Sequence, residues 1–341
     1  MSQKGWYMDI QRMFERGISD DLFTDFDVCV RGPVNLNFSG GRHVSSGSRL
    51  FDVSSLTKAL TYLVFWKLFV SGDLSPEEKF EHWMPDVPNV GDRELWHFMS
   101  YLVEDYSFDR DLLRKGLLGT SCKDTLLSKG FGRWQKTFHY DNYAGAFLGM
   151  ILEWHFGANI QDVLHDNLLC DSHDGKNLLF HPVRRGLIHS DLVVPTRDDM
   201  AMRGLVHDPL SFAHPRENLA VAGVFSDAQT LAGVFHYHLD PIIRSGFYDI
   251  ASRNQLSKVG IRGHKWALGF DIPNPESLDD ISVESPLIFA GWTGCRIFFA
   301  KHPRVTIAIT TNRVFCEDSP ESRKRFSQLF WGVVREILRW S

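Results

Sequence analysis

A serine and a lysine three residues apart are the pair in this sequence best suited to covalent chemistry. Ser55 and Lys58 begin an apolar run that ends before Gly72, which predicts a helix ending near residue 71. Residues i and i+3 of a helix lie on one face, so the amine can reach the hydroxyl. A neutral amine would accept the hydroxyl proton and activate Ser55 as a nucleophile. The same four-residue pattern also occurs at helix starts whose lysine is simply solvated.

Tyr140 and Asn142 form a second pair, just before an apolar run from residue 144 to residue 154 that predicts a helix. A phenol and an amide two residues apart on a loop suit proton transfer and hydrogen bonding to a carbonyl group or to Lys58. The alternative is structural, because an asparagine before a helix can cap it.

A third segment, Phe-Ala-Gly-Trp-Thr-Gly-Cys at positions 289–295, carries two glycines on a predicted strand. Gly291 and Gly294 weaken a strand unless another group must approach the backbone closely. The segment therefore belongs with the other two as a candidate part of a site.

Strands are predicted at both ends of the chain and helices in between. The expected strands are 25–30, 34–38, 265–272, 287–290, 295–300 and 305–311, and the expected loops of the helical middle are 87–95, 129–140, 172–183 and 208–219. An N-terminal helix is expected over 8–16, and a closing amphipathic helix from Ser319 with Phe326, Leu329, Phe330, Val333, Ile337 and Leu338 on one face. Strands from both termini predict one mainly antiparallel sheet with an all-α insertion.

The order of the three segments resembles that of the serine β-lactamase-like superfamily, which includes class C β-lactamases, penicillin-binding peptidases and family VIII carboxylesterases. The segments 51–58, 206–209, 222–226 and 310–313 resemble family contexts too, so the resemblance spans about residues 8–340. It implies an α/β (α+β) fold of the β-lactamase/DD-peptidase type. We expect a sheet domain of residues 1–58 plus 240–341, an inserted helical domain of residues 59–239, and an active site in the cleft between them.

The resemblance also implies roles for the residues. Ser55 would attack a carbonyl carbon, while Lys58, with Tyr140, would take its proton and Tyr140 would protonate the leaving group. Asn142 would orient Lys58 and the substrate. The oxyanion hole would combine the N–H of Ser55 with one from the third segment, at Trp292 or Cys295. No metal ion and no organic cofactor is implied.

The third segment departs from the family pattern, in which K-T-G or H-T-G supplies a cation for a substrate carboxylate. Either Trp292-Thr293-Gly294 is the motif, as in family VIII esterases, or Phe289-Ala290-Gly291 takes its place. Neither alignment offers lysine or histidine, which favours an uncharged ester or amide substrate. Arg296, predicted on the same strand face as Trp292, is a candidate replacement cation.

Composition and charge disfavour several other classes of protein. The net charge of −5 and the lack of a basic run disfavour nucleic-acid binding. No apolar stretch is long enough for a membrane span. The N-terminal residues do not read as a signal peptide, so we expect a cytoplasmic protein, or a periplasmic one if a leader has been trimmed. The cysteines, at positions 29, 122, 170, 295 and 316, are expected to be reduced thiols.

The sequence thus predicts a serine hydrolase that forms an acyl-enzyme on a small-molecule ester, amide or lactam, most simply an esterase for small acyl esters. The alternatives are a β-lactamase or D-amino-acid peptidase, an acyltransferase, and a catalytically silent family member that only binds a ligand. The intact Ser55, Lys58, Tyr140 and Asn142 argue against silence. The oligomeric state is left open.

Overall fold

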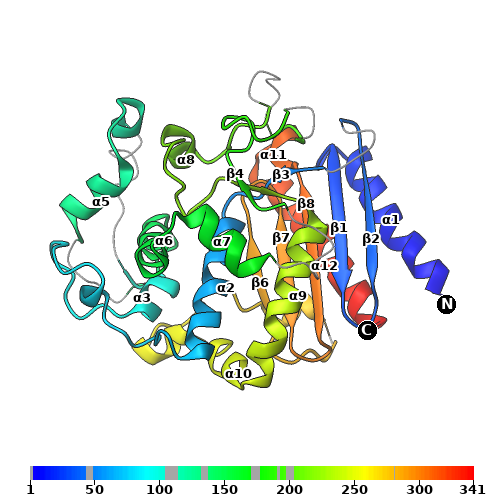
Figure 1. Cartoon of the computed structure of the whole chain (residues 1–341). Helices are drawn as coiled ribbons and strands as arrows, with labels where there is room; N and C mark the ends of the chain where they lie inside the picture. The colour runs from blue at the N-terminus through cyan, green and yellow to red at the C-terminus, as the bar shows by residue number, and fades with distance from the viewer. Residues whose placement is uncertain are drawn as a thin grey trace.

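A five-stranded antiparallel sheet forms the centre of the molecule (Figure 1). The computed structural model describes residues 3–43, 49–103, 114–131, 137–169, 177–189, 193–196, 203–279 and 281–341. The strands are β1 (Asp25–Arg31), β2 (Leu36–Gly41), β6 (Leu287–Ala290), β7 (Arg296–Ala300) and β8 (Val305–Thr311), in the order β2-β1-β8-β7-β6. Because β1 pairs with β8, the two ends of the chain share one sheet. This confirms the antiparallel sheet predicted from both termini.

The terminal helices cover one face of this sheet, as Figure 1 shows. These are α1 (Gln3–Ser19), which is longer than predicted, and α12 (Pro320–Arg339). The helix α12 starts at Ser319, whose hydroxyl accepts a hydrogen bond from the N–H of Ser322. Its apolar side packs with Phe14 of α1 and Phe298 of β7 in one buried cluster. The amphipathic face predicted for the closing helix therefore lies on the sheet.

The other face of the sheet carries α2 (Leu56–Ser71) and α9 (Ala228–Arg244). Nearly every side chain of α2 is buried, and Gly72 ends the helix in a left-handed conformation with φ of 80°. The predicted domain boundary at 239/240 falls inside α9, which packs on β1 and β8. The two-domain division itself stays a prediction.

Shorter helices and 3₁₀ turns complete the molecule, and several of the helices lie on the side of α2 away from the sheet (Figure 1). They are α3 (Leu95–Met99), α5 (Cys122–Lys129), α6 (Tyr143–Phe156), α7 (Ile160–Leu168), α8 (Pro209–Ala213) and α10 (Phe247–Ala251), with α11 (Arg313–Cys316) and 3₁₀ turns at Phe80–His82, Gln255–Val259 and Pro275–Leu278. The loop expected over 208–219 contains α8. No helix among the described residues is long and apolar enough to cross a membrane.

The sequence analysis missed one small sheet, and one of its expected strands was wrong. A small second sheet, β3 (Phe51–Asp52), β5 (Val224–Ser226) and β4 (Leu179–Phe180), was not predicted, because strands of two or three residues leave no period to detect. The segment 265–272 forms only isolated bridges. Gly269 turns this segment with φ of +93° and lies so close to Tyr62 that a Cβ atom would come within 2.6 Å of its ring.

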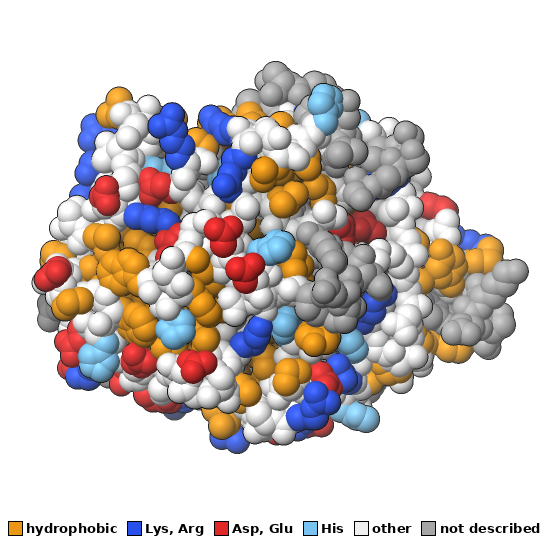
Figure 2. Space-filling view, in the orientation of Figure 1, with side chains coloured by type: hydrophobic (Ala, Val, Ile, Leu, Met, Phe, Trp, Pro, Cys, Tyr) orange, Lys and Arg blue, Asp and Glu red, His pale blue; other side chains and the backbone are white. Residues whose placement is uncertain are grey.

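Charged side chains of both signs are interspersed on the face shown in Figure 2, in keeping with the small net charge. Four of the five cysteines lie among the described residues, and none of these four forms a disulfide bond there. Cys29, Cys122 and Cys295 are buried and Cys316 is partly buried, whereas Cys170 lies outside the described residues.

Candidate active site

The turn from β3 into α2 presents Ser55. Ser54 has a φ of +50°, an unusual value for a residue with a side chain. Its N–H donates to Oδ1 of Asp52 (2.8 Å), and its carbonyl accepts from the hydroxyl of Thr57 (2.8 Å). These contacts hold the strained turn. Ser55 then occupies the N-cap position of α2, but its side chain makes no capping hydrogen bond. The hydroxyl is therefore not consumed by the helix end.

Lys58 is fully buried, and its Nζ atom has three oxygen neighbours. They are Oγ of Ser55 at 3.1 Å, Oδ1 of Asn142 at 2.8 Å and the carbonyl oxygen of Val221 at 3.0 Å. A neutral amine has two N–H groups and one lone pair, which match two pure acceptors and one hydroxyl. In that state the amine would donate to Asn142 and Val221 and accept a hydrogen bond from the Ser55 hydroxyl, whereas a charged ammonium would donate to all three oxygens. No carboxylate of the described residues forms an ion pair with it.

A glycine leaves the space that Lys58 occupies. Gly145 lies on α6, next to the lysine side chain and the Ala220 carbonyl group. A Cβ atom at this position would come within 3.2 Å of Cγ and Cε of Lys58 and of that carbonyl oxygen. The close packing of α6 on α2 thus fixes the path of the lysine from its helix to Ser55.

Asn142 reaches Lys58 instead of capping α6. Its position is the N-cap, yet its side chain makes no capping bond. The cap is supplied by Asp141, whose Oδ1 accepts from the N–H groups of Tyr143 (2.8 Å) and Ala144 (3.1 Å). The amide nitrogen of Asn142 lies 3.4 Å from Oδ2 of Asp208. The capping alternative for Asn142 is therefore wrong.

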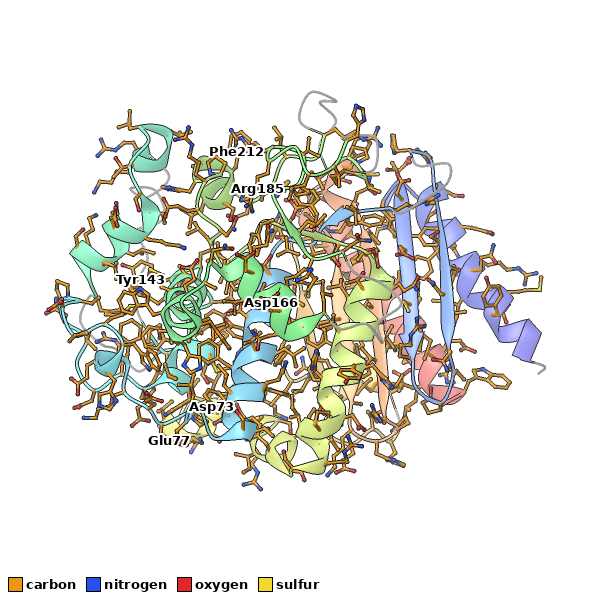
Figure 3. All side chains as sticks on the ribbon, viewed as in Figure 1. Asp73, Glu77, Tyr143, Asp166, Arg185 and Phe212 are labelled. Carbon is orange, nitrogen blue, oxygen red and sulfur yellow. The ribbon has the colours of Figure 1, made fainter. Side chains whose placement is uncertain are left out.

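Tyr140 covers Lys58 from the solvent side. Nζ of Lys58 lies 5.3 Å from the centre of the Tyr140 ring, and the Tyr140 side chain is 40% exposed. Tyr143, labelled at the start of α6 in Figure 3, donates its hydroxyl to the Gly130 carbonyl group (3.3 Å) and so is committed elsewhere. Tyr140 is thus the tyrosine that accompanies the Ser55–Lys58 pair.

Tyr101 packs against Tyr140 and is itself held by a hydrogen bond with Tyr62. The ring of Tyr101 lies 4.6 Å from that of Tyr140, and its hydroxyl lies 2.7 Å from the hydroxyl of Tyr62 on α2. The Tyr101 carbonyl oxygen also accepts from the N–H of His139. Burial raises the pKa of both Tyr62 and Tyr101 well above the usual value, so their hydroxyls stay protonated. The sequence reasoning missed this pair, because neither tyrosine lies in a recognisable motif.

The residues of the third segment, 289–295, lie in two different environments. Phe289 on β6 is buried in the core cluster around α2, and its ring centre lies 6.4 Å from that of Tyr140. Thr293 and Cys295 are buried under β3, where the Thr293 hydroxyl donates to the Asp52 carbonyl group (2.7 Å). Burial raises the pKa of the Cys295 thiol to about 12. Of the two alternative alignments, this arrangement favours the one that begins at Phe289.

The turn after β6 explains the two glycines. A Cβ atom on Gly291 would come within 2.4 Å of the Val53 carbonyl oxygen, and one on Gly294, with φ of +105°, within 2.3 Å of Oγ1 of Thr311. Trp292 is half exposed and donates from Nε1 to Asp318 (2.8 Å), while its carbonyl group accepts from Arg313 (2.7 Å). The close approach expected from the glycines is to other parts of this protein, the Val53 backbone for Gly291 and the Thr311 side chain for Gly294.

Arg296 does not reach the Ser55 group. Residues 296, 298 and 300 of β7 face α12, whereas residues 297 and 299 face α2 and α9. The Arg296 guanidinium lies over the rings of Phe326 (4.9 Å) and Phe330 (4.7 Å) of α12. The sequence argument for a replacement cation failed because the turn at 291–295 breaks the alternation that it assumed.

Ala290 is a candidate that the sequence could not offer. Its neighbour Ile288 exchanges both backbone hydrogen bonds with Asp271 across the outer edge, whereas the N–H of Gly291 bonds inward to Cys295 (2.7 Å). Backbone direction alternates along a strand, so the N–H and C=O of Ala290 point to the outer edge. The residue is exposed. The sequence gives no sign of this role, because the donor is a backbone N–H group and the alanine side chain has no polar atom.

The histidine pair at 236 and 238 on α9 does not form a metal site. Nε2 of His238 lies 3.0 Å from the Leu168 carbonyl oxygen, whereas His236 lies beside Thr306 of β8 and burial lowers its pKa to about 4. Across the part of the chain that the structure describes, no three metal-binding side chains come together.

The fold matches that of solved β-lactamase-like and penicillin-binding-protein-like structures. No family model matches the sequence, and a search of curated proteins finds no match. Among solved structures, the chain is similar to EstCE1, a hydrolase with promiscuous acyltransferase activity, with a TM-score of 0.71 and 12% identity over 97% of this chain and 99% of that chain.

Two further structures show the same fold. A β-lactamase/D-alanine carboxypeptidase from Pseudomonas syringae has a TM-score of 0.70 at 14% identity, over 97% of this chain and 99% of that one. Simvastatin synthase (LovD, a mutant form) from Aspergillus terreus has a TM-score of 0.68 at 13% identity, over 97% of this chain and 95% of that one.

Proposed function

We propose that this protein is a serine acyl hydrolase that forms an acyl-enzyme on Ser55 and acts on esters with a neutral acyl group. The observation that carries the proposal is the buried Nζ of Lys58, 3.1 Å from Oγ of Ser55 and held by Asn142 and the Val221 carbonyl group. A lysine in this setting has two fixed acceptors and one partner that can give it a proton. That is the requirement for a general base.

In the acylation step, Lys58 takes the hydroxyl proton as Oγ of Ser55 attacks the ester carbonyl carbon. The developing oxyanion is bound by backbone N–H groups. The N–H of Ser55 donates to no other described residue, and the N–H of Ala290 faces the open edge of β6. Ala290 therefore joins Trp292 as a candidate for the second donor in this proposal, whereas Cys295 is fully buried.

Tyr140 is the group assigned to protonate the leaving alcohol, because it is partly exposed and its ring centre lies 5.3 Å from Nζ of Lys58. The proton reaches it from Lys58, over whose amine the Tyr140 ring lies. A water molecule then attacks the acyl-enzyme with Lys58 as the base and releases the acid. Asn142 keeps the amine directed at Ser55 in both steps.

The proposed preference for uncharged substrates rests on Phe289. This ring is buried with its centre 6.4 Å from that of Tyr140, and an aromatic side chain at this position provides no partner for a carboxylate. A charge-assisted hydrogen bond is worth roughly 1.5–3 kcal/mol, so its absence weakens carboxylate substrates by about tenfold to a hundredfold. Penicillins, which carry such a group, are therefore expected to be poor substrates.

Active-site labelling tests the proposal. A fluorophosphonate should add to the wild-type protein and to Ser54→Ala, but not to Ser55→Ala, as measured by intact mass. Ser54 is the matched control because it places the neighbouring hydroxyl in the same turn. p-Nitrophenyl butyrate should be hydrolysed with a kcat/KM at least a hundredfold above that for a chromogenic cephalosporin. Labelling of Ser55→Ala, or efficient lactam hydrolysis, would refute the assignment.

A further inference from the structure

A second cavity lies behind β6, on the α12 side of the sheet. Its volume is about 630 Å³, which is in the range of sites for small organic molecules. Its walls come from the segment 254–277, from β6 and β7, and from α12. The side chains of Ile288, Ala290 and Arg296 line this cavity, whereas Phe289 is buried on the opposite face of the sheet. Arg296 thus lies on the α12 face of the sheet, whereas Lys58 belongs to α2, which packs on the other face.

The cavity contains a cation without a counterion. The Arg296 guanidinium has one polar partner among the described residues, Oγ of Ser327 at 3.4 Å, and no carboxylate within ion-pair distance. Its other neighbours are the rings of Phe326 and Phe330. Burial, with a smaller effect of the Arg313 charge, lowers its pKa to about 10. A partly buried guanidinium with most of its five donors unused favours an anion beside it.

The rest of the wall suits an anion with an organic body. The Oδ1 atom of Asn254 accepts from the N–H of Trp266 (3.1 Å), which leaves the Asn254 amide NH₂ for a ligand. Ile288 and Trp331 supply apolar surface, and the exposed Lys265 adds positive charge at the rim. A planar carboxylate matches the fork of an arginine, and an aromatic or aliphatic body matches the apolar wall.

We propose that this cavity binds a small organic carboxylate through Arg296, at a site distinct from the nucleophile. The charged or titratable groups that line it are Arg262, His264, Lys265, Asp271 and Arg296. Asp271 opposes an anion when ionised. Burial raises the pKa of Asp271 to about 6 and lowers that of His264. Binding should therefore be tighter at pH 5.5, where Asp271 is mostly protonated, than at pH 8.

Calorimetric titration of the full chain with benzoate tests this proposal, with benzyl alcohol as the uncharged control. Benzoate should bind and benzyl alcohol should not. Arg296→Gln should weaken benzoate binding at least tenfold, and Asp271→Asn should remove most of the pH dependence. Protein labelled on Ser55 by a fluorophosphonate should bind benzoate like the unlabelled protein. Loss of binding on labelling would place benzoate in the active site and overturn the proposal.

Arg296→Gln also removes side-chain packing against α12. A second variant therefore distinguishes loss of the binding site from a folding defect. Asn274 is an exposed residue of the cavity wall, and Asn274→Trp would fill the cavity without touching Arg296. It should abolish benzoate binding while the melting temperature stays within a few degrees of wild type. Undiminished binding in this variant would overturn the proposal. Because binding is read without turnover, this test can fail or succeed independently of the esterase assignment.

Discussion

The side-chain oxygen of Asn142 lies 2.8 Å from Nζ of Lys58, across 84 positions of sequence. This contact joins the loop before α6 to the first turn of α2 inside the protein. One N–H of the Lys58 amine donates to Asn142, and another donates to the Val221 carbonyl group. The third position around Nζ of Lys58 is directed at Ser55.

Replacing Asn142 by Asp should inactivate more than replacing it by Ala. A carboxylate 2.8 Å from the amine favours the charged ammonium, which cannot accept a proton. We expect Asn142→Asp to lower kcat at pH 7 by at least a hundredfold and to move the acid limb of the pH–rate profile upward. Asn142→Ala should lower kcat by about tenfold with a smaller shift of that limb. Equal profiles for the two variants would contradict a role in setting the charge of Lys58.

Lys58→Arg should be as inactive as Lys58→Ala. A guanidinium keeps the positive charge but does not lose a proton in the accessible pH range. Burst-phase kinetics with p-nitrophenyl butyrate should show no acylation in either variant, whereas circular dichroism should show that both fold. An Lys58→Arg protein with measurable acylation would show that Lys58 acts only through its charge.

Removing one hydroxyl of the Tyr62–Tyr101 pair should affect catalysis through Tyr140. Tyr101→Phe keeps the ring under Tyr140 but loses the bond that ties it to α2. We expect kcat to fall about threefold to tenfold, with KM little changed and the basic limb of the pH–rate profile shifted.

Tyr248→Phe is the matched control, since the Tyr248 hydroxyl is also buried and donates to the Ser285 carbonyl group (2.7 Å). Each substitution should cost about 0.5–1.5 kcal/mol of stability. Only Tyr101→Phe should change kcat. An equal effect of both on kcat would mean that stability alone is being measured.

Asp27 should make the protein less stable as the pH rises. Burial raises its pKa from 3.8 to about 7, in part offset by a hydrogen bond from the N–H of Ala228. Between these two pH values the folded protein keeps a proton that the unfolded chain has released, so the free energy of unfolding falls with increasing pH. The full effect, present above pH 7, is at most about 4 kcal/mol.

Asp27→Asn removes this titration and can still accept from Ala228. The variant should therefore melt at a higher temperature than wild type at pH 8, and the difference should shrink towards pH 4. Thermal unfolding followed by circular dichroism at pH 4, 6 and 8 measures it. A difference that is the same at all three pH values would show that Asp27 does not titrate in this window.

The helix that carries Ser55 and Lys58 could be predicted from local sequence, because a three-residue spacing at a helix start, an apolar run and a terminal glycine are all short-range signals. The same holds for β8 and for the closing helix, whose boundaries and buried face follow from periodicity and from Ser319. The strand expected at 265–272 failed because Gly269 turns the chain beside Tyr62, a residue two hundred positions away.

The rest of the site could not be predicted from local sequence, because it depends on contacts between distant parts of the chain. Asn142 could cap a helix or hold a lysine, and only the packing of α6 on α2 decides for the lysine. Arg296 and Phe289 are both plausible beside a nucleophile, and the turn at 291–295 sends them to opposite faces of the sheet. Ala290 has no side-chain chemistry at all. Its role depends on the direction of a backbone N–H at a sheet edge, and pairing with β7 and Asp271, not residue type, sets that direction.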